Sequence, residues 1–389
     1  MSINLAELER IAREQALPAI DNQISKEPSP FLEKIAKPPL TSSKIDVITG
    51  VGLNGGFGYG GENKDIPKGG GQIYEKFQLD TADMYGTIEI SNKALQLGLG
   101  DKGINLLMNE MQGIKDAMTW NIGRSLFGNG KGILANVTAS SGAVNKITVD
   151  STKLLKEGLT VDFYTTGAGV DSTPAHTGKR IVGIDRANKT ITVDGSAITV
   201  AAGFITVQGS YGREIFGLGA FFDTSITSIY GVEKSKASWL IPEEYDASSA
   251  ISDTLISKAV REARNYKNSN TDMILCGDTA YDAYVDYMKE SKTMVTNTQE
   301  FWGGVQGLYI TADGRKVVVV HESNVADDEM IGVDTTQFLF PKTPTDFITK
   351  DGGVFERLQN GTIFQAVLGC YGNLICKNPG GIFKITNIA

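Results

Sequence analysis

The clearest pattern of hydrophobic and polar positions runs from Lys102 to Phe127. Apolar side chains recur there at intervals of three and four residues, the spacing of one helical face. They are Ile104, Leu107, Met108, Met111, Ile114, Met118, Ile122 and Leu126. Gly128, Gly130 and Gly132 follow, and glycine is favoured just past a helix C-terminus. The segment is predicted to be one long helix with a core-facing stripe.

A second pattern, on both sides of a glycine-rich segment, is the alternation typical of β-strands. The positions are Ile45, Val47 and Ile48 before it, and Ile73, Phe77, Leu79 and Thr87 to Ile90 after it. Residues 45–90 are predicted to form an extended hairpin, with arms reaching ~50–65 Å at ~3.3 Å per residue. An isolated two-stranded hairpin is marginally stable. Two interpretations therefore stay open: a flexible surface loop, or an arm packed on a neighbouring subunit.

Glycine occupies ten of the twenty-two positions from Gly50 to Gly71. Gly50, Gly52 and Gly55 match the spacing of a dinucleotide-binding fingerprint, which needs a helix starting at the glycines to hold the pyrophosphate. Further glycines and Pro67 stand where that helix would lie, at a cost of about 1 kcal/mol per glycine and about 3 per proline. The segment is predicted to be a loop tip, and a nucleotide-dependent enzyme is disfavoured.

The N-terminal segment combines a short apolar helical face with a cluster of prolines. The face consists of Leu5, Leu8, Ile11 and Ala12, and Pro18 is expected to end that helix. Five of the eleven prolines fall between Pro18 and Pro39. This density predicts an extended arm and not a packed element.

Short alternating runs rich in Thr, Val and Ile fill residues 138–208, which are predicted to be a small all-β insertion. The runs are KITV, TVDFYT, KRIVGI, KTITV, AITV and FITV. After Glu243 helical spacing returns, with Ser248 or Ser249 as the N-cap. Asp272 to Cys276 is predicted to be a strand, and Asp278 to cap a helix that runs through Tyr284 to Met288. Later strands are predicted from Lys316, at Phe338–Phe340, at Thr362–Leu368 and at Ile382–Ile385.

Composition narrows the function classes. The chain has 389 residues, 41% of them hydrophobic, and a net charge of −8. This charge argues against binding driven by phosphate neutralisation. Three scattered cysteines indicate a reducing compartment. The N-terminus lacks the apolar run of a signal peptide, and no stretch approaches eighteen apolar residues, so a soluble cytoplasmic protein without membrane contact is expected.

Candidate catalytic and metal-binding residues are few. His176 is expected to lie in a polar loop of the β insertion and His321 to end a predicted strand, and neither has metal-ligand spacing. Cys370 and Cys376 are expected to be small buried thiols. The acidic runs at 243–244 and 327–329 are expected to be solvated loops, with weak Ca²⁺ binding as an alternative for the second. No catalytic residue, metal site or cofactor is predicted.

Two segments carry a resemblance to a known family. SLFGNGKGILANV (Ser125 to Val137) resembles the segment after the long helix in tailed-bacteriophage major capsid proteins. LCGDTAYDAYVDYM, from Leu275, resembles their strand–Asp–helix segment. The resemblance implies an α+β phage major-capsid fold, shared with encapsulins. It implies an N-terminal arm (1–44), an extended glycine-tipped hairpin or E-loop (45–91), a peripheral domain with the spine helix (92–137 and 209–269), an all-β insertion (138–208) and an axial domain (270–389).

The resemblance also implies a function. It implies a major capsid protein that self-assembles into pentamers and hexamers of an icosahedral shell enclosing double-stranded DNA, without sequence-specific binding. Such a protein is structural, not an enzyme, and belongs to the virion after assembly in the host cytoplasm. The arm before the hairpin is too short for a fused scaffolding domain, so separate scaffolding and portal proteins are expected, with decoration proteins left open. The alternatives are an encapsulin-like compartment enclosing enzyme cargo and, more weakly, the nucleotide-dependent enzyme.

Five residues are predicted to contact neighbouring subunits: Phe57, Tyr59, Lys64, Lys68 and Trp302. The aromatic pair lies in the hairpin tip, and core packing is the alternative for Trp302. Some members of the family join a hairpin lysine covalently to an asparagine. The resemblance makes Lys64 or Lys68 a candidate for this linkage, with Asn360 or Asn378 as the partner, and no motif fixes the pairing.

Overall fold

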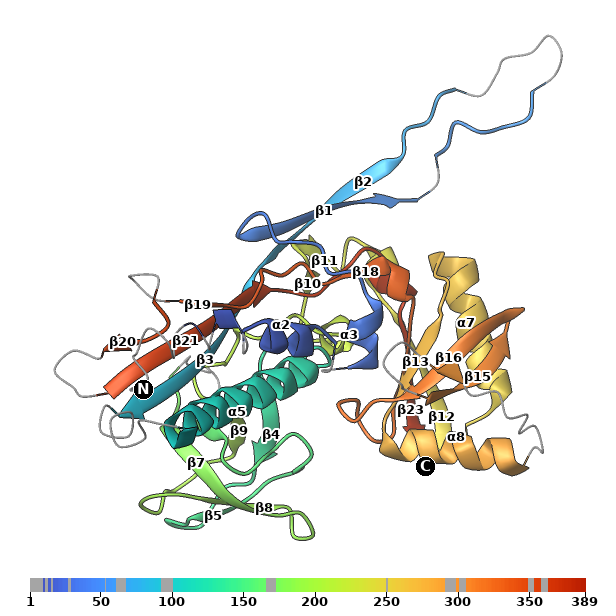
Figure 1. Cartoon of the computed structure of the whole chain (residues 1–389). Coiled ribbons are helices and arrows are strands. Elements are labelled where there is room, and N and C mark those ends of the chain that lie inside the picture. Colours follow the sequence, from blue (N-terminus) through green and yellow to red (C-terminus); the bar gives the residue numbers. More distant parts are fainter. Residues whose placement is uncertain are drawn as a thin grey trace. The chain divides into compact units, whose positions relative to one another are not determined.

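The computed structural model in Figure 1 describes residues 10, 13–14, 17–26, 29–52, 54–60, 68–91, 101–165, 173–249, 251–290, 299–300, 306–348, 353–357 and 363–389. The chain divides into two compact units, the first made of residues 1–119 and 221–389 and the second of residues 120–220. α5 (Asp101–Ser125) and α6 (Gly219–Phe222) cross the boundaries between them. The predicted α+β class and the long helix are confirmed.

A seven-stranded mixed sheet forms a large part of the first unit. Its order is β12 (Glu243–Ser249), β23 (Phe383–Ile388), β17 (Met330–Val333), β13 (Met273–Cys276), β16 (Arg315–His321), β15 (Gln306–Ala312) and β14 (Gln299–Glu300). β12 runs parallel to β23 and β13 parallel to β16, while the other neighbours are antiparallel. Segments that the sequence predicted as separate strands thus form one sheet.

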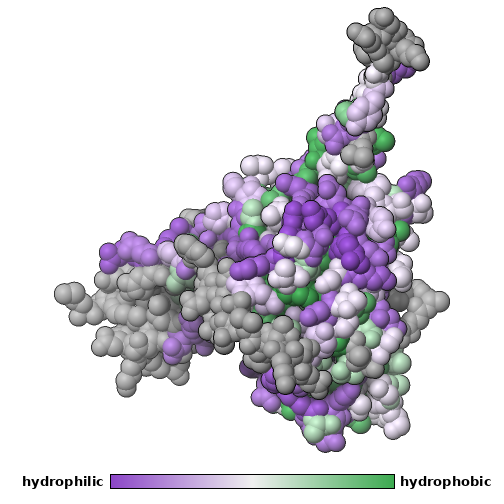
Figure 2. Space-filling view, turned by 90° about the vertical axis from the view of Figure 1, so that its right-hand side faces the viewer, coloured by the Kyte–Doolittle hydropathy of each residue, from purple (hydrophilic) through white to green (hydrophobic). Residues whose placement is uncertain are grey.

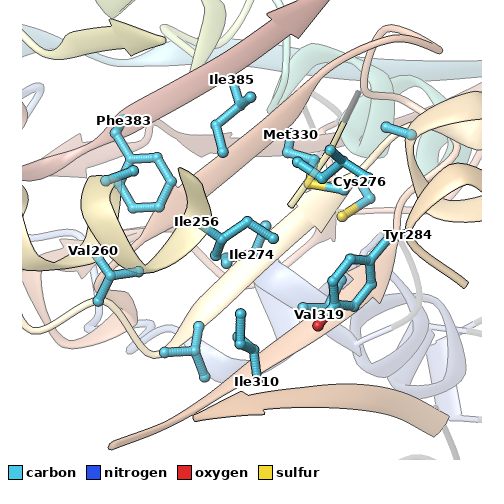
Figure 3. Close-up of a cluster of buried hydrophobic side chains, with 14 of the residues drawn as sticks. Ile256, Val260, Ile274, Cys276, Tyr284, Ile310, Val319, Met330, Phe383 and Ile385 are labelled. Atoms are coloured by element: carbon cyan, nitrogen blue, oxygen red, sulfur yellow. The ribbon is translucent and has the colours of Figure 1, made fainter. Parts of the chain in front are cut away.

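Two helices cover one face of this sheet and share a core with it. They are α7 (Asp253–Lys267) and α8 (Asp278–Glu290). Figure 3 shows Ile256 of α7 and Tyr284 of α8 beside strand residues such as Ile274 and Phe383, and all four are fully buried. The apolar residues of both helices therefore face the core.

The predicted N-terminus of α7 is wrong. Residues 243–249 form β12, whose extended backbone pairs with β23, so neither Ser248 nor Ser249 caps the helix. The N-cap is Ser252, whose hydroxyl accepts a hydrogen bond from the Leu255 amide at 3.3 Å. The pairing of β12 with β23 determines where the helix starts, and the helical spacing of apolar residues does not show where that pairing ends.

A second sheet in the first unit packs on α5. β3 (Ala82–Ser91) and β21 (Ile363–Gly372) pair over ten residues, and β19 (Asp346–Phe347) and β20 (Glu356–Arg357) pair with the other edge of β21. Gly86 of β3 leaves no room for a Cβ, because Ile114 and Met118 of α5 would lie 2.7 and 2.8 Å from it. The expectation that Thr87 to Ile90 extend the hairpin is wrong, since these residues pair with β21.

The expectation that residues 18–39 are an unpacked arm is also wrong. α2 (Leu17–Lys26) and α3 (Pro30–Lys34) are helices, and Ile20, Ile24 and Phe31 are almost completely buried. Pro18 and Pro30 lie in the first turns, where a missing N–H costs no helical hydrogen bond. Of the predicted helix over Leu5 to Ala12, only Arg10 is described, and it is helical.

Polar contacts, buried at Ser29 and partly buried at Asp21, hold these two helices to the rest of the first unit. Lys342 Nζ lies 2.6 Å from Asp21 Oδ1, and the Thr345 amide and hydroxyl donate to the same oxygen. The Ser29 hydroxyl caps α3 and donates to Glu322 Oε2 at 2.5 Å. Burial raises the pKa of Glu322 above its usual value of 4.5, although the hydrogen bonds from Ser29 and Asn324 oppose the shift.

Short elements complete the first unit. They are β1 (Lys44–Val51), β2 (Ile73–Asp80), β10 (Ser228–Ile229), β11 (Val232–Glu233), β18 (Phe338–Leu339), β22 (Ile375–Cys376), and the 3-10 turns η2 (Ser238–Leu240), η3 (Thr335–Gln337) and η4 (Pro379–Gly381). β10 pairs with β11, and β18 with β22. Phe31 of α3 packs edge-on against Phe338 of β18, with ring centroids 5.0 Å apart.

The second unit is built on one six-stranded antiparallel sheet. Its order is β4 (Ile133–Val137), β9 (Gly203–Val207), β6 (Thr160–Thr165), β7 (His176–Asp185), β8 (Thr190–Val193) and β5 (Lys146–Thr148). Phe163, Ile181, Ile191 and Ile205 are fully buried in its core. The run AITV forms only an isolated bridge at Ile198, so it is not the strand that was expected. β4 precedes residue 138, and the predicted domain boundaries stay predictions.

The exit of α5, within the second unit, is held by a buried ion pair and a close backbone contact. Arg124 donates to both carboxylate oxygens of Glu214, at 2.9 and 2.6 Å, and both side chains are buried. Leu218 donates its amide to the Leu126 carbonyl at 2.7 Å. A Cβ on Gly217 would overlap the carbonyl oxygens of Ser125 and Leu126, so this position requires glycine.

Replacing Gly217 with alanine is expected to lower the free energy of unfolding by about 1–3 kcal/mol, because the methyl group meets rigid backbone. Gly142→Ala is the matched control, since a Cβ there has no neighbour within 4 Å. Denaturant unfolding of the two variants measures the difference. Equal stabilities would show that the 214–219 segment moves aside freely.

Glu322→Gln is expected to change how stability depends on pH. A raised folded-state pKa means that Glu322 favours folding below about pH 4.5 and loses this contribution as pH rises through the shifted value. The neutral amide cannot ionise, so the melting temperature of the variant relative to the natural chain should be higher at pH 7.5 than at pH 4.5. The same difference at both pH values would contradict a buried, pKa-shifted carboxyl.

Candidate functional site

The hairpin of β1 and β2 is the candidate functional site. Eight residue pairs join the strands in antiparallel register, from Lys44 opposite Asp80 to Val51 opposite Ile73. The predicted hairpin is therefore confirmed for the paired residues 44–51 and 73–80, and Figure 1 shows the two strands side by side. Eight paired residues span ~26 Å at ~3.3 Å each. The paired part is shorter than predicted, because β3 leaves it at Thr81 to join β21.

The base of the hairpin is anchored by aromatic packing within the first unit. Phe77 is fully buried, its ring centroid 5.3 Å from that of Tyr230 and 5.9 Å from that of Trp239. The Gln78 amide donates to the Tyr230 carbonyl at 3.1 Å. The Thr49 hydroxyl donates to the Lys377 carbonyl at 3.0 Å. The contacts of Phe77 and Gln78 hold the base of the hairpin, and the Thr49 hydrogen bond holds β1 farther along.

The two faces of the hairpin differ in chemistry because side chains alternate along each strand. One face carries Ile45, Val47, Phe77 and Leu79 and is buried or half-buried. The other face carries ion pairs across the strands, Lys76 to Asp46 at 2.8 Å and Lys44 to Asp80 at 3.7 Å. All four charged side chains are well exposed. The Lys76 hydrogen bond lowers the pKa of Asp46.

The outer half of the hairpin exposes large apolar side chains. Ile48, Ile73 and Tyr74 are 70%, 65% and 64% exposed, and Phe57 and Tyr59 are 81% and 97% exposed. Figure 2 shows hydrophobic surface on the hairpin below its grey tip. Exposed aromatic side chains gathered on one projection are typical of a contact surface. The sequence pattern singled out Phe57 and Tyr59 but not Ile48 and Tyr74. These two could have been identified because strand alternation places them on the face opposite the buried residues.

Glycines let the two sides of the tip approach each other. A Cβ on Gly56 would lie 2.8 Å from the Gly70 nitrogen, and one on Gly70 would lie 2.6 Å from the Gly56 nitrogen. The Asn54 side chain accepts a hydrogen bond from the Gly56 amide at 2.8 Å. Residues 54–60 form a turn and an irregular segment, so the glycines do not begin a helix at this point.

The structure tests the placement of only some predicted contact residues. Phe57 and Tyr59 lie together, with an edge-to-face separation of 5.5 Å between ring centroids. Lys68 is exposed in an irregular segment. Lys64, Trp302 and Asn360 lie outside the described residues. Asn378 donates its side-chain amide to the Lys267 carbonyl at 2.7 Å, so this amide is engaged within its own chain.

Outside the hairpin, the two histidines make hydrogen bonds within the chain and the three cysteines are buried. The loop predicted at His176 is wrong, because this residue begins β7, and its Nε2 donates to the Thr199 carbonyl at 2.9 Å. His321 Nε2 donates to Asp278 Oδ1 at 2.5 Å. All three cysteines are buried free thiols, and burial raises the pKa of each. No group of three or more His, Cys, Asp or Glu is placed to hold a metal among the described residues. Their helices include none that is long and apolar enough to cross a membrane.

Comparison with known proteins gives the fold its name. No family model matches the chain, and no curated protein matches its sequence. Among solved structures, the cyanophage A-1(L) capsid asymmetric unit is similar over 92% of this chain and 92% of that chain, with a TM-score of 0.53 and 10% identity. The chain has the phage major-capsid fold. The family resemblance suggested by two short segments is thereby confirmed at the level of fold.

Two further structures are similar at lower TM-scores. The satellite phage P4 procapsid with its size-determination protein matches over 96% of this chain and 98% of that chain, with a TM-score of 0.44 and 10% identity. The holo-SrpI encapsulin complex from Synechococcus elongatus PCC 7942 matches over 93% and 89%, with a TM-score of 0.46 and 8% identity. Assigning residues 1–44 and 45–91 to the N-arm and E-loop of the phage major-capsid fold stays a prediction.

Removing the tip aromatics should not affect the stability of the folded chain. Phe57→Ser combined with Tyr59→Ser is expected to change the free energy of unfolding by less than about 0.5 kcal/mol, because both rings are exposed. Phe77→Ala is the comparison and is expected to cost about 3–5 kcal/mol, because its ring is fully buried. Thermal and denaturant unfolding of the unassembled chain distinguishes the two. A large loss in the double variant would show that the tip belongs to the subunit core.

Proposed function

We propose that this chain is the subunit of a protein shell, a major capsid protein that assembles copies of itself into an icosahedral shell of pentamers and hexamers. The observation that carries the proposal is the hairpin, anchored at its base by Phe77 and exposing large apolar side chains beyond it. The phage major-capsid fold supports the same function. The role proposed here is structural and not enzymatic.

The energetics of the hairpin favour contact with a second copy. Ordering a residue costs roughly 1–2 kcal/mol of backbone entropy. Phe57 and Tyr59 recover little of that in the isolated chain, because they are 81% and 97% exposed. Each ring buried against a neighbour contributes about 1.5–3 kcal/mol. A shell repeats the contact at every subunit, so a modest gain per hairpin becomes decisive.

The proposed contents of the shell are double-stranded DNA. The net charge of −8 means that attraction between this chain and phosphate does not fill the shell, so packaging is driven by other components. Separate scaffolding and portal proteins are proposed partners, with assembly in the host cytoplasm and residence in the virion. Encapsulins share the architecture, and a compartment enclosing enzyme cargo is therefore the alternative.

The natural chain is expected to form closed shells or their ring precursors, visible by negative-stain microscopy. The variant with Phe57→Ser and Tyr59→Ser should stay at the size of the free subunit or ring at concentrations where the natural chain assembles. Val182→Ser, which removes an apolar side chain that is 55% exposed in the second unit, is the control and should assemble normally.

Three outcomes separate the alternatives. A natural chain that stays monomeric over a wide concentration range would contradict the proposed shell. Normal shells from the double variant would contradict the role of the hairpin tip. In shells purified from cells producing the whole assembly, nuclease-protected DNA supports the virion, whereas co-purifying enzyme without DNA supports the compartment.

A further inference from the structure

The two helices on the seven-stranded sheet carry opposite charges on their outer sides. α7 exposes a basic stripe, Lys258, Arg261 and Arg264, and α8 exposes an acidic stripe, Asp278, Asp282 and Asp286. The inner sides of both helices are buried in the same core. Figure 2 views the side toward which α7 and β15 lie in Figure 1, and most of its described surface is hydrophilic. Opposite charges thus occupy neighbouring elements of one compact unit.

Local contacts do not join the two stripes to each other. Arg264 pairs with Asp313, and Lys258 lies 5.9 Å from the centre of the Tyr245 ring. On α8, Asp278 accepts from His321, and Asp286 pairs with Lys289 at 2.7 Å. Among the described residues, no ion pair connects α7 with α8. All six stripe residues are exposed, so both stripes face outward from the unit.

The charge on each helix is nearly of one sign. The acid within the basic stretch, Glu262, is half-buried and accepts a hydrogen bond from the Tyr245 hydroxyl at 2.8 Å. The basic residue on α8, Lys289, is bonded to Asp286 at the end of the helix. The centre of each stripe, Arg261 on α7 and Asp282 on α8, is exposed. These central residues are the best probes of any contact that the stripes make.

We propose that the two stripes are the halves of a contact between copies of this chain, in which α7 of one copy faces α8 of the next. The proposal rests on the proposed shell function. Contacts of α7 with α7, or α8 with α8, bring like charges together and are repulsive, whereas α7 against α8 is attractive. A head-to-tail contact of this kind closes into a ring when its rotation fits.

The two stripes match in length as well as in charge. At a rise of ~1.5 Å per residue, the acidic stripe spans ~12 Å and the basic stripe ~9 Å. The charges lie on exposed helix surfaces, so salt weakens their attraction, with a screening length of about 8 Å at physiological ionic strength. The contact supplies orientation and specificity, while the hairpin supplies apolar burial.

A charge-reversal cycle tests this contact. Arg261→Glu and Asp282→Lys are made singly and together, and the concentration at which assembly begins is measured by light scattering and microscopy. Each single reversal is expected to raise that concentration at least tenfold, and the double reversal to restore it to within about threefold of the natural chain. Lys236→Glu, at a side chain 75% exposed in the first unit, changes the net charge equally to Arg261→Glu and should have no effect.

The outcomes are distinct from those of the shell proposal. Unchanged melting temperatures show that the variants fold, and Arg261→Gln and Asp282→Asn give the same test with smaller perturbation and smaller expected effects. The contact is overturned if the single-reversal variants begin to assemble at the same concentration as the natural chain. It is also overturned if the double-reversal variant folds but needs as high a concentration as the single variants. A natural chain that never assembles overturns the shell and this contact together. If the natural chain assembles and the charge-reversal variants assemble equally well, the contact is overturned and the shell is not.

Discussion

The burial of Phe77 against Tyr230 and Trp239 is the interaction on which the hairpin depends. A two-stranded ribbon is marginally stable without additional packing. Here the packing is confined to one end: Ile45 and Phe77 are buried near the base, while Ile73 and Tyr74, farther along, are more than 60% exposed. The same subunit therefore contains a fixed origin for the hairpin and an outer part whose apolar surface is not covered by its own chain.

Periodic patterns predicted those elements whose stability comes from one buried face. α5, α7 and the strands of the second unit have this property, and the sequence identified them. The prolines between residues 17 and 34 predicted extended chain where the structure has two helices, because proline is favourable in a first helical turn and its presence alone does not indicate extended chain. β3 pairs with β21, about 280 residues away in sequence, and local sequence patterns do not predict such a pairing.

The candidate site was predictable in part. The glycine-rich tip and its two aromatics were identifiable because the glycines and Pro67 disfavour a helix there, and Phe57 and Tyr59 are the two aromatic residues among them. The exposed positions of Ile48 and Tyr74 were not, because their exposure depends on the register of β1 with β2 and on which face Phe77 buries. The opposite charges of α7 and α8 were readable residue by residue, but only the fold places both helices on one face of one sheet.

The distribution of cysteines allows the unfolding of the first unit to be measured separately from that of the second. Cys276, Cys370 and Cys376 all lie in the first unit, are buried, and have pKa values raised by that burial, so the folded chain offers no ready thiolate. The second unit contains no cysteine. Alkylation by a thiol reagent therefore reports the opening of the first unit alone. The all-β sheet of the second unit can unfold and refold without being alkylated.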